Sequence, residues 1–256
     1  MKIVIGVLIA WLLIPPATCG ADPADVFLGA AKRELAESRV ATPPTAEGKR
    51  SPIGPQLYRR VVDTVVLVVT ENAIGTGVVV TSQGHVLTNA HVVGTNEVVA
   101  VVPRNAELLK GIDRLRQEHL VLTQVVAVDV LRDLALLHMQ SVPAGLKPAP
   151  LGEAGAVEVG QDVYSIGHPK GLLWSYTEGV VSQVRPDYEW SYGDGVQHRA
   201  TVLQTQTPTH RGSSGGALFD GGGRIVGINY GGKDPTLSFA IAVGEVRDWI
   251  QTLAQK

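Results

Sequence analysis

Short runs of apolar and β-branched residues recur from Thr64 to the end of the chain. Each run is bounded by Gly, Asn, Asp or Pro, as in "TVVLVVT", "GVVVT", "VVAVV", "LVLTQVVAV", "LALLHM", "TVLQTQT", "RIVGINY" and "SFAIAV". Glycine-containing turn sequences lie between them, at 82–84, 193–195 and 220–223. Many short strands at this spacing predict a β-sandwich or a β-barrel and disfavour alternating β and α units.

Four segments depart from this strand pattern. Residues 22–55 start as a helix-compatible sequence, "PADVFLGAAKRELAESRV", and continue as a Pro- and Gly-rich linker. A short helix is expected at "QLYRRVV", and the charged segment 103–119 is expected to be a partly helical insertion. The closing segment "VGEVRDWIQTLAQK" predicts an amphipathic helix whose apolar side carries Val246, Trp249, Ile250 and Leu253.

The first 21 residues have the three-part layout of a secretory signal. Lys2 precedes an apolar run from Ile3 to Ile14, and small residues follow. The run is short for a membrane span, so we expect cleavage after Ala21 and an exported protein, periplasmic or secreted. An uncleaved membrane anchor is the alternative.

The cysteine count follows from this reading. Cys19 is the only cysteine, so the mature chain is expected to have no disulfide. A lipid-attachment site at "PATC" is disfavoured, because Pro16 stands where such signals usually have Leu.

Composition narrows the possible functions. The chain has 256 residues, a net charge of −2 and 45% hydrophobic residues, which suits a large all-β domain or two small ones. No basic stripe with interleaved aromatic residues is present, so no nucleic-acid partner is expected. The sequence also lacks H-E-x-x-H, a C-x-x-C pair and a phosphate-binding loop, so no metal and no cofactor are expected.

The segment "THRGSSGGALFD" at 209–220 carries candidate nucleophile chemistry. A serine that attacks a carbonyl needs an exposed hydroxyl, a base, and donors directed at the oxyanion. The G-x-S-G-G spacing selects Ser214 and assigns the oxyanion donors to the N–H groups of Gly212 and Ser214. A plain glycine-serine turn remains the alternative.

Candidates for a base and a carboxylate lie earlier in the chain. Among seven histidines, His91 stands out because "VLTNAHVV" places it at the end of an apolar strand. In "VDVLRDLALLHM", Asp133 leads directly into an apolar strand, and Asp129 is the other carboxylate. Each residue alone is more often structural, as turn chemistry explains an aspartate before a strand.

Together these segments resemble the trypsin-like serine endopeptidases of the HtrA (Deg) branch over roughly residues 56–252. The resemblance rests on the ordered segments "GTGVVVTSQGHVLTNAHVV", "DVLRDLALL", "YSIGHPKG", "TEGVVS", "LQTQTPTHRGSSGGALFD" and "SFAIAV". The order His91, Asp133, Ser214 matches the chymotrypsin-type fold.

This resemblance implies an all-β protease domain over 56–256, built from two perpendicular six-stranded antiparallel β-barrels at about 56–150 and 151–256. The first barrel would supply His91 and Asp133, and the second would supply Ser214, with the three residues meeting in the cleft between the barrels as a catalytic triad.

The sequence also departs from the family. No PDZ module is expected after residue 256, and His210-Arg211 replaces the Asn-Pro that often precedes the serine loop. Pro208, six residues before the nucleophile, would lie at the base of the primary pocket, which predicts a preference for small or medium apolar side chains. The residues expected to pair with the substrate backbone are Leu237, Ser238, Phe239 and Ala240.

The function expected from these features is peptide-bond hydrolysis by an exported serine endopeptidase acting on polypeptides. The alternative is a catalytically silent or latent peptide-binding module, which would need a partner or removal of residues 22–55. The sequence leaves the oligomeric state open.

Overall fold

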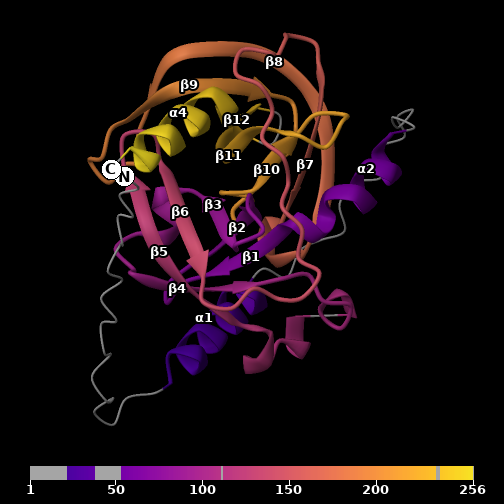
Figure 1. Cartoon of the computed structure of the whole chain (residues 1–256), viewed down its shortest axis with the longest axis vertical. Helices are drawn as coiled ribbons and strands as arrows, with labels where there is room; N and C mark the ends of the chain where they lie inside the picture. Colours follow the sequence, from indigo (N-terminus) through magenta and orange to yellow (C-terminus); the bar gives the residue numbers. More distant parts are fainter. Residues whose placement is uncertain (1–21, 38–52, 111, 235–236, 256) are drawn as a thin grey trace, which may run out of the picture.

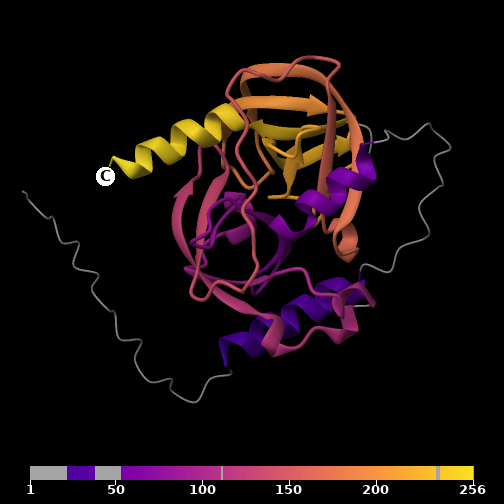
Figure 2. The same ribbon diagram turned by 45° about the vertical axis from the view of Figure 1, so that its right-hand side comes forward.

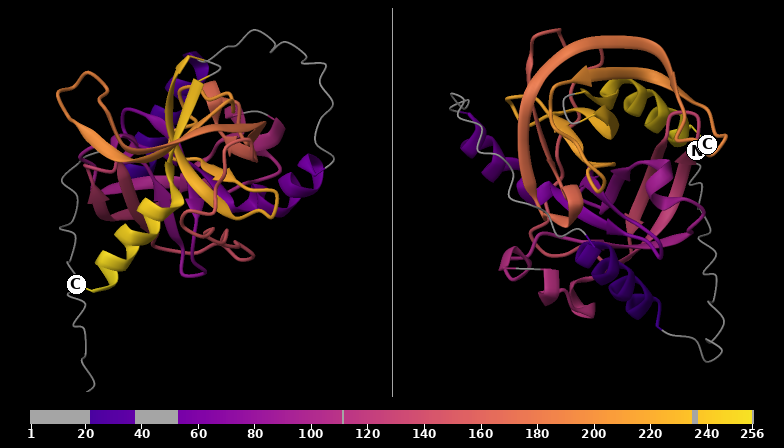
Figure 3. Two further views of the ribbon diagram at one scale, coloured as in Figure 1. Left: turned by 90° about the horizontal axis from the view of Figure 1, so that it is seen from above. Right: turned by 180° about the vertical axis from the view of Figure 1, so that it is seen from behind.

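The structure is a computed structural model that describes residues 22–37, 53–110, 112–234 and 237–255. The predicted signal segment and most of the predicted linker lie outside these residues. Within them, the strands close into two six-stranded barrels in which each strand pairs antiparallel with its neighbours (Figures 1 and 3). The predicted fold class is confirmed.

The strands follow one another in the same order in both barrels. The first barrel has the order β1-β2-β3-β6-β5-β4. The second, followed from β7, has the order β7-β8-β9-β12-β11-β10. The first contains β1 (Val65–Val69), β2 (Ile74–Val79), β3 (His85–Thr88), β4 (Val98–Val102), β5 (Val121–Asp129) and β6 (Leu134–Met139). The second contains β7 (Asp162–Gly167), β8 (Ser175–Trp190), β9 (His198–Thr205), β10 (Ala217–Phe219), β11 (Ile225–Asp234) and β12 (Leu237–Ala242).

Strand β1 is buried along its whole length, which explains its unbroken apolar sequence. Val66 and Val68 join one hydrophobic cluster, whereas Val65, Leu67 and Val69 join another that extends to the second barrel and the helices. A strand covered on both faces has no polar positions to alternate with its apolar ones.

Helices cover the outside of the barrels. Helix α1 (Pro23–Glu37) lies against β1 and β4 at the side of the first barrel away from the second (Figures 1 and 2). Helix α4 (Val243–Ala254) follows β12 and buries Val246 and Trp249, with Ile250 and Leu253 partly buried, as the amphipathic pattern predicts. No helix in the described ranges has the length and apolarity needed to cross a membrane.

The remaining helices are short. They are α2 (Gly54–Val61), α3 (Ala90–Val93), and the 3₁₀ turns η1 (Val62–Thr64), η2 (Leu108–Lys110), η3 (Ile112–Arg114), η4 (Gln117–His119) and η5 (Pro169–Gly171). Three of these turns, η2, η3 and η4, fall in the charged segment 103–119 and account for its mixed sequence pattern.

The two barrels approach closely at the turn that precedes β10. The backbone N–H of Thr76 in β2 donates to the Ser214 carbonyl at 2.8 Å. Gly215 has φ +83°, and a Cβ atom there would collide with the Thr76 carbonyl oxygen and the Thr88 hydroxyl. Only glycine permits both this backbone conformation and this separation.

We predict that Gly215→Ala destabilises the protein far more than Gly145→Ala. Both glycines have φ +83°, but a Cβ at Gly145 would meet nothing within 4 Å. Gly145→Ala should therefore cost about 1 kcal/mol, from the left-handed backbone alone. The added collision should bring the cost of Gly215→Ala above about 4 kcal/mol, an exceptional value for a single substitution. Urea unfolding measures both, and equal losses would contradict the close approach of the barrels.

Candidate active site

His91 and Asp133 meet in the first barrel through two hydrogen bonds. His91 lies in the single turn α3, directly after β3, and Asp133 lies at the end of the β5–β6 turn with φ +55°. The His91 backbone N–H donates to Asp133 Oδ1 at 2.9 Å, and His91 Nδ1 lies 2.8 Å from Asp133 Oδ2. Because a carboxylate only accepts, Nδ1 carries the proton and Nε2 is left as the basic nitrogen.

The two side chains of this pair differ in their exposure to solvent. The Asp133 side chain is fully buried, whereas 27% of the His91 side chain is exposed. The Asn89 side-chain amide also donates to the Asp133 carbonyl at 2.9 Å, which fixes the strained residue at the turn. The carboxylate is therefore enclosed by protein, whereas the imidazole is partly open to solvent.

Asp129, the other candidate carboxylate, has a structural partner. Its side chain binds Arg132 at 2.7 Å, and Arg132 Nε binds Glu245 of α4 at 2.9 Å. Burial raises the pKa of Glu245, but hydrogen bonds from the Thr201 N–H and from Arg132 outweigh it, and the net pKa is lowered. These ion pairs attach the turn that carries Asp133 to the C-terminal helix.

The two serines of the glycine-rich turn have different surroundings. Ser213 is buried, and its hydroxyl accepts from the His210 N–H at 3.3 Å. Ser214 is half-buried, and its hydroxyl donates to the Tyr230 carbonyl at 3.3 Å. A register shift between Asn229 and Gly231 in β11 is a β-bulge, which explains how the carbonyl of Tyr230 can face the serine.

The predicted oxyanion loop is held from outside. The Arg211 carbonyl accepts from the Lys170 N–H at 2.8 Å, and the Gly212 carbonyl accepts from the Thr76 hydroxyl at 2.7 Å. Because a trans peptide directs its N–H opposite to its C=O, the Gly212 N–H points away from Lys170. Within the described turn, backbone hydrogen bonds use the N–H groups of Ser213, Gly215 and Gly216 and not those of Gly212 and Ser214.

His168 supports this loop, which the sequence analysis missed. Its Nδ1 lies 2.9 Å from the Thr76 hydroxyl oxygen. Because that hydroxyl donates to Gly212, Nδ1 must carry the proton and donate. Burial lowers the pKa of His168 to about 3, so the imidazole stays neutral. The sequence feature that could have indicated this support is Thr76, a polar residue between two glycines ("GTG" at 75–77) in a strand that is buried throughout.

The prediction that Leu237–Ala240 pair with a substrate backbone is wrong. Strand β12 is paired on both sides, with β11 through Asn229↔Ala240 and with β9 through Ala240↔Leu203. It therefore has no free edge. The pairing of β10 with β11 ends at Ala217↔Ile228, so among the described strands none covers the outer edge of β11 at Tyr230–Gly232.

Ser238, one of the residues predicted to pair with substrate, lies opposite Gly232 of this edge, and Pro208, the predicted pocket residue, follows strand β9. Ser238 is fully buried, and its hydroxyl pairs with that of Thr209 at 2.7 Å. Pro208 is exposed beside Thr209, and its carbonyl accepts from the Thr177 hydroxyl at 3.4 Å. The backbone of Ser238 is thus already paired within the sheet, and its buried side chain binds Thr209.

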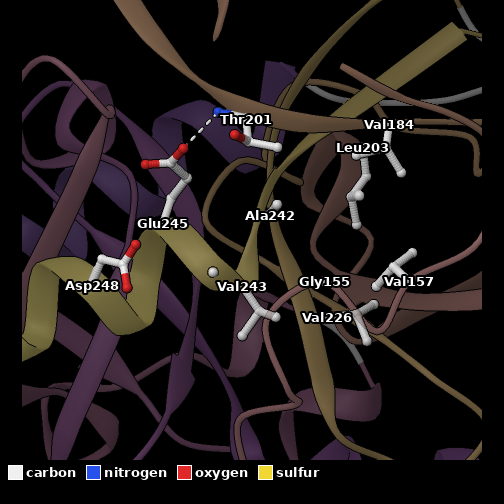
Figure 4. Close-up of a pocket in the computed structure, with 11 residues that line it drawn as sticks. Gly155, Val157, Val184, Thr201, Leu203, Val226, Ala242, Val243, Glu245 and Asp248 are labelled. Carbon is white, nitrogen blue, oxygen red and sulfur yellow. Dashed lines mark hydrogen bonds between the residues drawn. The ribbon is translucent and has the colours of Figure 1, made fainter. Parts of the chain in front are cut away.

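A separate pocket of about 220 Å³ opens beside the start of α4 (Figure 4). Its walls come from β8, β9, β11 and β12 and are mostly apolar, with Glu245 and Asp248 on the helix side. None of the predicted site residues lines it. In the described ranges, no group of three or more His, Cys, Asp or Glu side chains could hold a metal ion.

We predict that Thr76→Val slows the reaction of Ser214 with a fluorophosphonate probe by about 10- to 100-fold. Valine keeps the shape of threonine but leaves the Gly212 carbonyl and His168 Nδ1 without their partner, which loosens the predicted oxyanion donors. Thr76→Ser retains the hydroxyl and should react within about threefold of the wild type. Equal rates for the valine and serine variants would show that the hydroxyl does not hold the loop.

His168 predicts a pH dependence of stability. Its pKa is about 3 in the folded protein and 6.5 in the reference state. Above pH 6.5 His168 is neutral in both the folded and the unfolded protein. At lower pH it binds a proton in the unfolded chain but stays neutral in the folded protein. The free energy of unfolding should therefore fall from pH 6.5 towards pH 3, by about 1.4 kcal/mol per pH unit from this group.

His168→Asn should reduce that slope, because the asparagine amide can donate to Thr76 without titrating. Urea unfolding at several pH values between 4 and 7 measures the slope for both proteins. Parallel curves would contradict a buried neutral histidine.

Comparison with known proteins identifies the family. A family model described as a trypsin-like peptidase domain matches residues 75–228, more than half of the chain. The chain is 32% identical over 187 residues to "Protease Do-like 1, chloroplastic" of Arabidopsis thaliana, covering 71% of this chain and 39% of the relative. It is 29% identical over 177 residues to "Serine endoprotease DegS" of Haemophilus influenzae, covering 69% of this chain and 45% of the relative.

Other matches agree with these. The chain is 32% identical to "Periplasmic serine endoprotease DegP" of Salmonella typhimurium over 61% of this chain and 30% of the relative. It thus spans less than half the length of these curated relatives. A crystal structure of Rv3671c from M. tuberculosis H37Rv, a mutant in an inactive form, matches in fold, with a TM-score of 0.64 and 23% identity over 84% of this chain and 98% of that chain. The chain belongs to the trypsin-like peptidase family, with relatives of the HtrA type.

Proposed function

We propose that the chain is a serine endopeptidase that hydrolyses peptide bonds through an acyl-enzyme. The observation that carries this proposal is the two-point contact between His91 and the buried carboxylate of Asp133. It leaves Nε2 of His91 as the basic nitrogen. Val92, the next residue, and the carbonyl of Ser214 both lie against Gly75 of β2, which supports a common location for the two candidates.

The residues take the following roles. Ser214 Oγ attacks the scissile carbonyl and passes its proton to His91 Nε2, while Asp133 orients the imidazole and stabilises its charged form. The N–H groups of Gly212 and Ser214 stabilise the oxyanion. His91 then returns the proton to the leaving amine. Water, deprotonated by His91, next attacks the acyl-enzyme ester, and the proton passes to Ser214 Oγ as the carboxylic acid is released.

A substrate strand would add to the uncovered edge of β11 at Tyr230–Gly232. This edge begins at the carbonyl that now accepts the Ser214 hydroxyl. A substrate N–H that bound this carbonyl would displace the hydroxyl and free it for His91, which couples substrate binding to activation of the nucleophile.

Substrate class and location follow from weaker observations. The relatives are named as endoproteases, which supports polypeptide substrates. Pro208, predicted to lie at the base of the primary pocket, and the nearby Thr209 and Ser238 include no acid, which supports small or medium apolar side chains at the cleavage site. The sequence of residues 1–21 and the periplasmic relative support export.

We predict that the purified chain reacts with a fluorophosphonate probe and that Ser214→Ala abolishes the reaction. Ser213→Ala is the matched control, because it removes a hydroxyl one residue away that binds the loop backbone. Labelling that survives Ser213→Ala and is lost in Ser214→Ala places the nucleophile at 214. A wild-type chain that does not react, alone or with an unfolded polypeptide present, would contradict the proposed activity and leave a silent peptide-binding module as the better description.

A further inference from the structure

Tyr192 binds the carboxylate on which His91 depends. Its hydroxyl donates to Asp133 Oδ2 at 2.7 Å, the same oxygen that His91 Nδ1 contacts at 2.8 Å. The Tyr192 and His91 rings lie 4.5 Å apart, tilted by 51°. Asp133 thus has a third donor besides the two nitrogens of His91, and this donor comes from the second barrel.

The loop that carries Tyr192 is attached to the turn that carries Asp133. Tyr192 lies between β8 and β9, and β9 begins with His198 and Arg199. His198 Nδ1 lies 2.7 Å from the Val130 carbonyl, and the Arg199 N–H donates to the Leu131 carbonyl at 2.7 Å. These contacts attach the end of the Tyr192 loop to the β5–β6 turn. They therefore help to position the phenol, in addition to its own hydrogen bond.

Other aromatic side chains of the second barrel pack next to the phenol ring. The His198 ring lies 5.2 Å from the Tyr192 ring and stacks on Trp190 at 5.3 Å, and Trp190 stacks on Tyr230 at 4.3 Å. Tyr192 is 41% exposed, and His198 gives its ring a packed aromatic neighbour within this cluster.

The phenol is protonated at neutral pH, because its ordinary pKa is about 10 and the protein raises it. Burial raises the pKa of Tyr192, and the negative charge of Asp133 and the hydrogen bond to it raise the pKa further, against a smaller opposing effect from Trp190. Tyr192 therefore acts as a hydrogen-bond donor at neutral pH. Without the phenol, Oδ2 would keep only His91 Nδ1 as a donor, and a hydrogen bond to a buried charged group contributes more than one between neutral groups at the surface.

We propose that Tyr192 is a positioning residue for the peptidase reaction, which holds the Asp133 carboxylate in the orientation that His91 requires. The inference rests on the proposed function. Tyr192 acts through Asp133 and His91 and takes no proton in the reaction. Without the hydroxyl, the two donors of His91 alone hold the carboxylate, and its orientation is less firmly fixed.

Tyr192→Phe tests this role, because it removes the hydroxyl and keeps the ring. Tyr58→Phe is the matched control: the Tyr58 hydroxyl also joins two separate segments, donating to the Trp174 carbonyl at 3.1 Å. With the full chain, Tyr192→Phe should lower the fluorophosphonate reaction rate and kcat about tenfold and leave KM for a peptide substrate unchanged. The proton on His91 Nδ1, followed by NMR, should exchange faster with water.

Tyr58→Phe should change neither the rate nor the proton exchange. The inference is overturned if Tyr192→Phe reacts at the wild-type rate with unchanged exchange, or if both variants lose the same activity, which would indicate a merely structural role. A wild-type chain that fails to react overturns the proposed function itself. A reacting wild type matched by Tyr192→Phe overturns the role of Tyr192 alone.

Discussion

The close contact between strand β2 and the serine turn is the constraint on which the site depends. Thr76 uses three groups there: its N–H binds the Ser214 carbonyl, its hydroxyl binds the Gly212 carbonyl, and its own carbonyl accepts from the Thr88 hydroxyl at 2.7 Å. Only a glycine at 215 lets the backbones approach this far. One residue of the first barrel thus sets the position of the serine turn of the second.

The second barrel in turn holds the carboxylate of the first. The β5–β6 turn that ends at Asp133 contacts Glu245 of α4 through Arg132 and the start of β9 through the Val130 and Leu131 carbonyls. Neither barrel therefore carries all three candidate residues. The geometry of His91, Asp133 and Ser214 depends on the same contacts that join the two barrels, so loss of packing between barrels should disturb the chemistry before either barrel unfolds.

The sequence predicted the two barrels, and it selected His91, Asp133 and Ser214 as candidates, because those features are local. Strand runs are bounded by turn residues, and His91, Asp133 and Ser214 each sit in a short recognisable segment. The supporting residues could not be predicted in this way. Thr76 and His168 are 92 residues apart, and Tyr192 and Asp133 are 59 apart, so their pairing is a product of tertiary structure. The edge of β11 was missed for a similar reason, since strand order decides which edge is free.

The hydroxyl of Ser214 shows how these supports combine. Its acceptor, the Tyr230 carbonyl, also lies 3.3 Å from the Tyr192 hydroxyl, so one bulged residue of β11 contacts both the candidate nucleophile and the donor to Asp133. A ligand strand on this edge would compete for that carbonyl and release the serine, while Tyr192 would keep its stronger contact with the charged carboxylate at 2.7 Å. The bulge in β11 that binds the Ser214 hydroxyl in the unliganded protein is therefore also where a ligand backbone would compete for the same carbonyl.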